Sequence, residues 1–201
     1  MKILLTGFEP FLNYTENSSW MTAEQVATRG VVGCEVIVEQ MPVSFTRVST
    51  ALRKAVEKHR PDAIVMLGQS GVSESVRLER VALNMMDATN ADNDSFSPNE
   101  QPISADAPSA LFTAMPIKSL RAAIDAAGVK VKISNSAGLY VCNRLYYEAL
   151  TMCNEQPSMR AIFVHLPFYE GQPSATINKP TMPLDSMVKA IQTIIEEIKN
   201  D

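Results

Sequence analysis

The stretch NSAGLYVCNRLYYEAL, Asn135 to Leu150, places a cysteine near the start of a helical pattern. Asn135 or Ser136 can cap that helix, and Gly138 is typical of a turn or a close approach before it. Cys142 would then lie near the positive end of the helix dipole, where a thiolate is favoured over a thiol. Its apolar neighbours suit a buried structural cysteine equally well, and the local pattern by itself favours that interpretation.

Two further cysteines have no comparable placement. Cys34 starts a predicted strand and Cys153 comes late in the helix of Cys142, so both are interpreted as structural. An odd number of cysteines without metal-ligand spacing, in a chain without an export signal, indicates reduced thiols. The sequence therefore predicts a cytoplasmic protein with no metal site and no cofactor.

A cysteine nucleophile needs a base beside it, and the chain contains only two histidines. His165 ends the apolar pattern AIFVHLPF, where a lone histidine is more often a core group than a base. It is nevertheless the candidate partner for the thiol, because His59 in AVEKHRPD stands at a charged helix end before a proline. His59 is predicted to be solvated there.

A third group must orient the imidazole and stabilise its charged form. Glu79, in SVRLERVALN, lies between apolar residues of a predicted interior strand, where a carboxylate is rarely found without a partner. An ion pair with Arg77 or Arg80 and the orienting role are both open. With Cys142 and His165, Glu79 would complete a Cys–His–Glu hydrolase set.

Apolar runs alternate with stretches of helical period along the whole chain. This order predicts an α/β protein with a largely parallel sheet covered on both faces, in one domain over residues 1–201. The predicted strands are Ile3–Thr6, Val36–Val43, Ala63–Leu67, Val76–Asn84, Val129–Ser134 and Ala161–Leu166. The predicted helices are Ser19–Arg29, Phe45–His59, Ile117–Ala127, Tyr140–Cys153 and Leu184–Lys199.

Ligands of open α/β sheets bind beyond the carboxyl ends of the strands. That rule directs attention to the segments that follow the strands: Gly7–Phe11, Gly68–Gly71, Ser134–Cys142 and His165–Phe168. One polar, turn-rich segment, Met86–Ala110, is longer than most loops and is either a surface insertion or a lid or binding loop.

The overall composition excludes several classes of partner. The 201 residues carry 18 Lys and Arg against 22 Asp and Glu, a formal charge of -4, and no basic cluster is interleaved with aromatic residues. Neither nucleic acid nor an anionic membrane surface is indicated as a partner. No apolar run is long enough for a membrane span or a signal peptide.

Several motifs, in order along the chain, resemble those of the pyroglutamyl peptidase I family, also called pyrrolidone-carboxylate peptidases. They are TGFEPF, LGQSG, LERVALN, DNDSFSPNEQPI, NSAGLYVCN, VHLPF and PTMPL. The resemblance covers nearly the whole chain, and the block around the cysteine is its most specific part. It implies a three-layer α/β/α sandwich and a cysteine exopeptidase that removes N-terminal pyroglutamate from peptides. A homodimer or homotetramer is also implied.

The resemblance assigns a role to individual residues. Cys142 matches the nucleophile, His165 the general base and Glu79 the residue that orients the histidine. The substrate lactam would lie between Phe8 and Phe11, hydrogen-bonded in the turn that contains Gln69, and the pocket would be completed by Tyr140 and Val141. Backbone N–H groups at the helix start would hold the oxyanion of the acyl transfer.

The chain also departs from the family pattern. Thr89 and Ser73 stand where the family usually has arginines, and Leu12 and Asn13 replace a pair of glycines. These differences keep two alternatives open. One is a cysteine amidase for another small cyclic or N-blocked amide, and the other is a catalytically weakened binding protein of the same fold.

Overall fold

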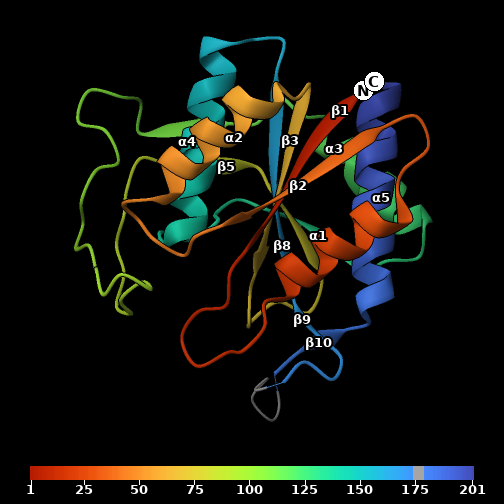
Figure 1. Cartoon of the computed structure of the whole chain (residues 1–201), viewed down its shortest axis with the longest axis horizontal. Helices are drawn as coiled ribbons and strands as arrows, with labels where there is room; N and C mark the ends of the chain where they lie inside the picture. The colour runs from red at the N-terminus through yellow and green to blue at the C-terminus, as the bar shows by residue number, and fades with distance from the viewer. Residues whose placement is uncertain (174–178) are drawn as a thin grey trace.

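A six-stranded sheet forms the centre of the molecule (Figure 1). The computed structural model describes residues 1–173 and 179–201. The strand order is β2-β1-β3-β8-β4-β7. The strands are β1 (Lys2–Phe8), β2 (Glu35–Met41), β3 (Ala63–Gln69), β4 (Val76–Glu79), β7 (Val131–Ser134) and β8 (Arg160–Leu166).

Helices cover both faces of this sheet, which confirms the predicted three-layer sandwich. On one side lie α1 (Ser18–Arg29), α3 (Ile117–Ala126) and α5 (Leu184–Asn200), and on the other α2 (Val48–His59) and α4 (Val141–Glu155) (Figure 1). Alternate residues of β1 serve the two layers: Ile3 and Leu5 join the first core and Leu4 the second. Burial on both faces explains why the central strands are almost continuously apolar.

The sheet is not parallel throughout. β2, β1, β3 and β8 run in one direction, whereas β4 pairs antiparallel with β8 and parallel with β7. β4 and β7 therefore run opposite to the other four strands. As a result, the first residues of β4 lie at the edge of the sheet where β8 ends.

The predicted strand Val76–Asn84 is wrong as a single element. It divides into β4 and a short β5 (Val81–Leu83), which pairs with β6 (Ala110–Phe112) outside the main sheet. The strand pairing changes at Arg80. Its N–H donates to the carbonyl of Ser134 in β7, whereas its carbonyl accepts from the N–H of Thr113, which follows β6. Two other short strands, β9 (Phe168–Tyr169) and β10 (Thr181–Met182), were not predicted either.

The capping residues predicted for α4 are also wrong. The helix begins at Val141, its N-cap is Tyr140, and no side chain of the described residues caps it. Asn135 and Ser136 lie too far upstream, and the Ser136 hydroxyl accepts from the N–H of Gly138 (3.2 Å), whose φ is 78°. The first-turn N–H groups of α4 are consequently free of a side-chain cap.

The long loop Met86–Ala110 is fastened to the body of the protein. Asp92 anchors it, since its carboxylate accepts from the N–H groups of Asp94 and Phe96 within the loop (2.9 Å each) and from that of Phe45 (2.8 Å) before α2. Phe96 also packs edge-on against Phe45, at 6.1 Å between ring centroids. The loop therefore packs as a structured layer against the α2–α4 side.

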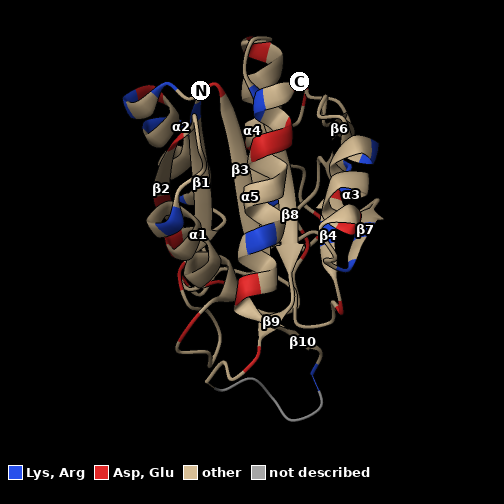
Figure 2. Cartoon of the chain, turned by 90° about the vertical axis from the view of Figure 1, so that its right-hand side faces the viewer, with Lys and Arg blue, Asp and Glu red and all other residues tan. Residues whose placement is uncertain are grey.

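Charged side chains lie mainly on the helices and in loops, and the strands between them carry few (Figure 2). None of the helices within residues 1–173 and 179–201 has the length and apolar character needed to cross a membrane.

Candidate active site

A buried pair, His165 and Glu79, lies where β8 and β4 meet. The antiparallel register sets Arg77 opposite His165 and Glu79 opposite Phe163. The His165 Nδ1 is 2.9 Å from the Glu79 Oε1, and the two residues are 7 % and 0 % exposed. Within the described residues Glu79 pairs with neither Arg77 nor Arg80, so its partner is the imidazole.

The surroundings of His165 favour its charged form. Burial of the ring lowers its pKa, but hydrogen bonds to Cys142 and Glu79 outweigh burial and raise the pKa to about 9. Because Nδ1 is held by Glu79, Nε2 is the ring nitrogen left for the sulfur of Cys142. The Glu79 carboxylate, the His165 imidazole and the Cys142 thiol therefore form a series through which a proton can pass.

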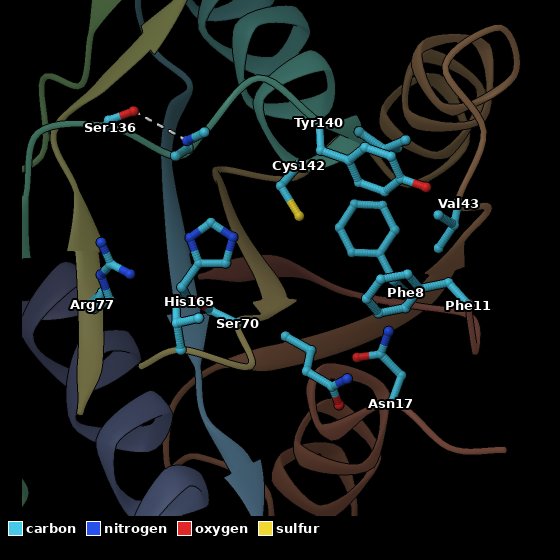
Figure 3. A pocket seen from close by; sticks show the side chains of 15 residues that line it. Phe8, Phe11, Asn17, Val43, Ser70, Arg77, Ser136, Tyr140, Cys142 and His165 are labelled. Carbon is cyan, nitrogen blue, oxygen red and sulfur yellow. Dashed lines mark hydrogen bonds between the residues drawn. The ribbon is translucent and has the colours of Figure 1, made fainter. Parts of the chain in front are cut away.

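Cys142 is the second residue of α4 and is half-buried. Its Sγ lies 3.1 Å from where a Cβ would stand on Gly68, which is the partner of His165 across the β3–β8 pair. A side chain at position 68 would also meet the Phe163 ring at 2.7 Å. Gly68 thus lets the sulfur approach the sheet next to the imidazole, and Figure 3 shows both side chains at one cavity.

The other thiols and the other histidine lie elsewhere. Cys34 and Cys153 are free and half-buried, neither lines the cavity, and burial raises the pKa of Cys153 to about 11. The prediction that His59 is solvated is wrong, because its Nε2 is 2.6 Å from the Glu39 Oε1 and the side chain is only 16 % exposed.

A cavity of about 420 Å³ opens beside Cys142 and His165. All five residues expected to contact substrate, Phe8, Phe11, Gln69, Tyr140 and Val141, line it. Its other lining residues are Asn17, Val43, Ser70, Val72, Arg77, Ser136, Ala137 and Gly138.

Aromatic rings form one side of the cavity, as Figure 3 shows for Phe8, Phe11 and Tyr140. Phe11 stacks at an angle on Tyr140 (6.4 Å between centroids), and Tyr140 packs edge-on against Phe45 (5.2 Å). The Tyr140 hydroxyl donates to the carbonyl of Ala91 in the long loop (3.0 Å), and burial raises its pKa to about 12. This aromatic wall is apolar, and Phe45 and the Ala91 carbonyl support it from outside the cavity.

Gln69 brings one polar group to the aromatic wall. Its Oε1 accepts from the Ser18 N–H (2.9 Å) and from the Gln172 Nε2 (2.8 Å). Its Nε2 is buried without a hydrogen-bond partner among the residues that the structure describes. A buried donor left unpaired in the protein is available to a ligand.

The positions that depart from the family pattern lie outside this cavity. Thr89 lines a neighbouring hollow of about 280 Å³, which shares Phe11 and Tyr140 with the cavity. Ser73 is buried, and its hydroxyl donates to the Ser75 carbonyl (2.6 Å). Within residues 1–173 and 179–201, no group of three or more His, Cys, Asp or Glu side chains is placed to bind a metal ion.

Sequence reasoning missed Arg77 as a residue of the cavity. The sequence indicated this arginine only as an ion-pair partner for Glu79, because ligands were expected at the carboxyl ends of the strands. Arg77 lies at the start of β4, and it reaches the edge where β8 ends only because β4 runs antiparallel to β8. A signal was present in the sequence, namely a cation two residues before a buried carboxylate on one face of a strand.

Comparisons with known proteins agree with this architecture. A family model described as pyroglutamyl peptidase matches residues 1–201. The pyrrolidone-carboxylate peptidase of Gloeobacter violaceus is 36 % identical over 201 residues, which cover 100 % of this chain and 98 % of that protein. The enzyme of the same name from Thermococcus onnurineus is 37 % identical over 197 residues, with 98 % of each chain covered.

Solved structures are similar over nearly the whole length. Pyrrolidone carboxyl peptidase from Fervidobacterium islandicum superposes with a TM-score of 0.94 at 31 % identity, covering 100 % of this chain and 99 % of that one. Pyroglutamyl peptidase I from Bacillus amyloliquefaciens gives 0.89 at 34 % identity, covering 96 % and 94 %. By family model, sequence identity and fold alike, the chain belongs to the pyroglutamyl peptidase family of enzymes.

Proposed function

We propose that this protein, as one domain over residues 1–201, is a cysteine exopeptidase that removes N-terminal pyroglutamate from peptides. The observation that carries the proposal is the meeting of Cys142, His165 and Glu79 beside an apolar cavity. In this mechanism Cys142 is the nucleophile, His165 the general base and acid, and Glu79 the group that orients and stabilises the imidazolium.

The cavity suits the chemistry of a pyroglutamyl group. Pyroglutamate is a neutral lactam without a free amine, so an enzyme that grips an N-terminal ammonium through carboxylates cannot bind it. No acidic residue is found among those that line the cavity in the described part of the chain. Phe8 and Phe11 offer uncharged walls to the lactam ring, and the Nε2 of Gln69 is a donor for the lactam carbonyl.

The reaction proceeds through an acyl-enzyme. The Cys142 thiolate attacks the pyroglutamyl carbonyl carbon, and the oxyanion that forms accepts hydrogen bonds from backbone N–H groups at the uncapped start of α4. His165 then protonates the departing amine as the C–N bond breaks. Water, deprotonated by His165, attacks the thioester, releases pyroglutamate and returns the proton to the thiol–imidazole pair.

The positions of Thr89 and Ser73 favour this function over the two alternatives. Neither residue lines the cavity, and the aromatic wall and the Gln69 amide expected to hold the lactam are both present there. The buried His165–Glu79 pair and the adjacent thiol also argue against a protein that only binds.

Hydrolysis of a fluorogenic pyroglutamyl amide tests the proposal. We expect the native protein to release the fluorophore, with a clear preference over prolyl and acetyl-alanyl amides, and Cys142→Ser to lose at least about a thousandfold in rate. Cys153→Ser, which changes a thiol outside the cavity, is the matched control and should retain activity. Full activity in Cys142→Ser would remove this thiol from the mechanism, and a preference for another blocked amide would favour the alternative amidase.

The proposal extends to the setting of the protein. Its three cysteines are free, which suits the reducing cytoplasm, where Cys142 would remain a reactive thiol. By resemblance we also propose a homodimer or homotetramer, which light scattering of the purified protein would distinguish from a monomer.

A further inference from the structure

Arg77 stands in the middle of a row of three side chains that crosses the sheet. Its partner in the antiparallel β4–β8 pair is His165, and its partner in the parallel β4–β7 pair is Lys132. Residues opposite one another in neighbouring strands project to the same face of a sheet. Across the sheet from β8 to β7, the His165 imidazole is thus followed by two cationic side chains, Arg77 and then Lys132.

Both cations lack an ionic partner. Within residues 1–173 and 179–201, Arg77 and Lys132 form no ion pair, although many surface cations of the protein do, such as Arg47 with Asp94 (2.7 Å). Two carboxylates near them are already engaged. Glu79 holds His165, and Glu74 pairs with Lys130 (3.2 Å). The half-buried guanidinium of Arg77 therefore lines the cavity without an ion-pair partner among the residues that the structure describes.

Arg77 lies on the opposite side of the reaction centre from the aromatic wall. In Figure 3, Phe8, Phe11 and Tyr140 are on one side of Cys142 and His165, and Arg77 is on the other. Beyond Arg77 lies a polar hollow of about 510 Å³, which shares Val72 and Arg77 with the cavity. This outer hollow is lined by Val72, Ser73, Glu74, Ser75, Arg77, Lys132, Ile133, Ser134 and Asn135.

The direction of a bound peptide follows from this arrangement. If the lactam ring lies against the aromatic wall, its exocyclic carbonyl lies at Cys142. The residue after pyroglutamate must then leave the reaction centre on the remaining open side, toward Arg77 and the outer hollow. Because pyroglutamate blocks the N-terminus, this following residue carries the nearest charge that a substrate can offer.

We propose that Arg77, supported by Lys132, is a specificity-determining residue that binds a carboxylate on the residue after pyroglutamate. The preferred substrates are pyroglutamyl dipeptides, through their free α-carboxylate, and peptides with Asp or Glu at that position. A guanidinium fork binds a carboxylate through two parallel hydrogen bonds. This inference rests on the proposed function and adds the substrate class to it.

Matched substrate pairs test the proposal. Pyroglutamyl-alanine is compared with pyroglutamyl-alanine amide, and pyroglutamyl-glutamate amide with pyroglutamyl-glutamine amide, so that the two sources of the carboxylate are measured separately. At low ionic strength we expect the native protein to hydrolyse at least one acidic member with kcat/KM about tenfold above its neutral partner, the effect of one hydrogen-bonded charge pair. Raising the salt concentration should reduce that ratio.

Charge-changing variants assign the preference to Arg77. Arg77→Gln should lower the acidic-to-neutral ratio to about one, with the larger loss on the acidic substrates, and turnover of the neutral substrates shows that the variant is folded. Arg77→Lys should retain part of the ratio, and Lys132→Gln should lower it less than Arg77→Gln. Arg121→Gln on α3 removes the same charge from an exposed position outside both hollows and should leave the ratio unchanged.

The outcomes separate the two proposals. If the native protein hydrolyses none of the four substrates, the proposed function is wrong and this inference falls with it. If it hydrolyses them without a preference for either acidic member, or if Arg77→Gln leaves the ratio unchanged, only the inference is overturned. An equal loss on all four substrates would also overturn it, because Arg77 would then act on the reaction centre.

Discussion

The two sides of the cavity differ in how they are built. The aromatic side is apolar and closely packed: Phe8 is only 3 % exposed, and Phe11 contacts both Tyr14 and Tyr140. The cationic side, with Arg77, is more open and contributes charges without partners in the described chain. The difference shows how one site can select a neutral ring by shape and a following carboxylate by charge.

The supports behind the two sides differ as well. The long loop anchors Tyr140 through the Ala91 carbonyl and reaches its neighbour Phe45 through Phe96. The cationic side lies instead on β4 and on β7, an edge strand that pairs with β4 alone among the described strands. Recognition on the aromatic side should therefore be insensitive to salt, whereas recognition on the cationic side should weaken as charges are screened.

The largest effect is expected from Glu79→Gln, which changes the centre that both sides serve. The amide stabilises neither the imidazolium nor the required tautomer of His165, so kcat/KM should fall on the order of a thousandfold or more. The loss should be equal for acidic and neutral substrates in steady-state kinetics. Glu155→Gln, an exposed carboxylate paired with Arg53 and outside both hollows, is the matched control and should change the rate less than about twofold.

A loss confined to one class of substrate would contradict this prediction. It would show that Glu79 acts on one side of the cavity rather than on the histidine.

An intermediate effect is expected from Phe11→Ala on the aromatic side. Removing this half-buried ring forfeits part of the roughly 1.5–3 kcal/mol of a fully buried phenyl group, so KM should rise about tenfold. The rise should be the same with acidic and neutral leaving groups and should not depend on salt concentration. Phe112→Ala, which removes a ring 67 % exposed on β6, should leave KM unchanged. If the rise in KM of Phe11→Ala depended on salt concentration, the two sides of the cavity would not differ in the way proposed.

The last effect concerns stability instead of activity, through the charge on His165 between the two sides. The pKa of His165 is raised in the folded protein to about 9 from 6.5, so the folded state binds this proton more tightly than the unfolded chain. The resulting stabilisation is fully present below about pH 6.5 and is lost as the pH rises through about 9. Urea unfolding between pH 6 and 9.5 should show this decline, and His165→Gln should lack that component. Identical pH profiles for the two proteins would mean that Cys142 and Glu79 do not hold the proton on His165.

Much of the fold could be predicted because its signals are local. Helical periods and apolar runs located five helices and the strands of the main sheet within a few residues. The prediction failed where an element depends on a distant partner. The run Val76–Asn84 has a continuous strand pattern, yet the hydrogen bonds of Arg80 to Ser134 and Thr113 divide it. β9 and β10 pair with each other across a separation in sequence that no local pattern reveals.

The candidate site was predicted in part for the same reason. His165 could be predicted because the chain has only two histidines. Glu79 could be predicted because a carboxylate rarely lies among the apolar residues of an interior strand. The residues alone did not decide whether Glu79 pairs with an arginine or with the histidine, and the resemblance gave the site its roles. The expected helix caps, Asn135 and Ser136, failed because a turn at Gly138 uses the Ser136 hydroxyl before α4 begins.

By itself the sequence determined which chemical groups are present: one thiol at a helix start, one imidazole at a strand end, one carboxylate among apolar residues, and phenyl rings after the first strand. Only the tertiary structure decided their partners. The reversal of β4 sets Arg77 beside His165, and Gly68 admits the sulfur of Cys142 between them and the aromatic wall. The physical reason is that side-chain periodicity is fixed by the local backbone, whereas strand order and direction are fixed by hydrogen bonds between segments far apart in the chain.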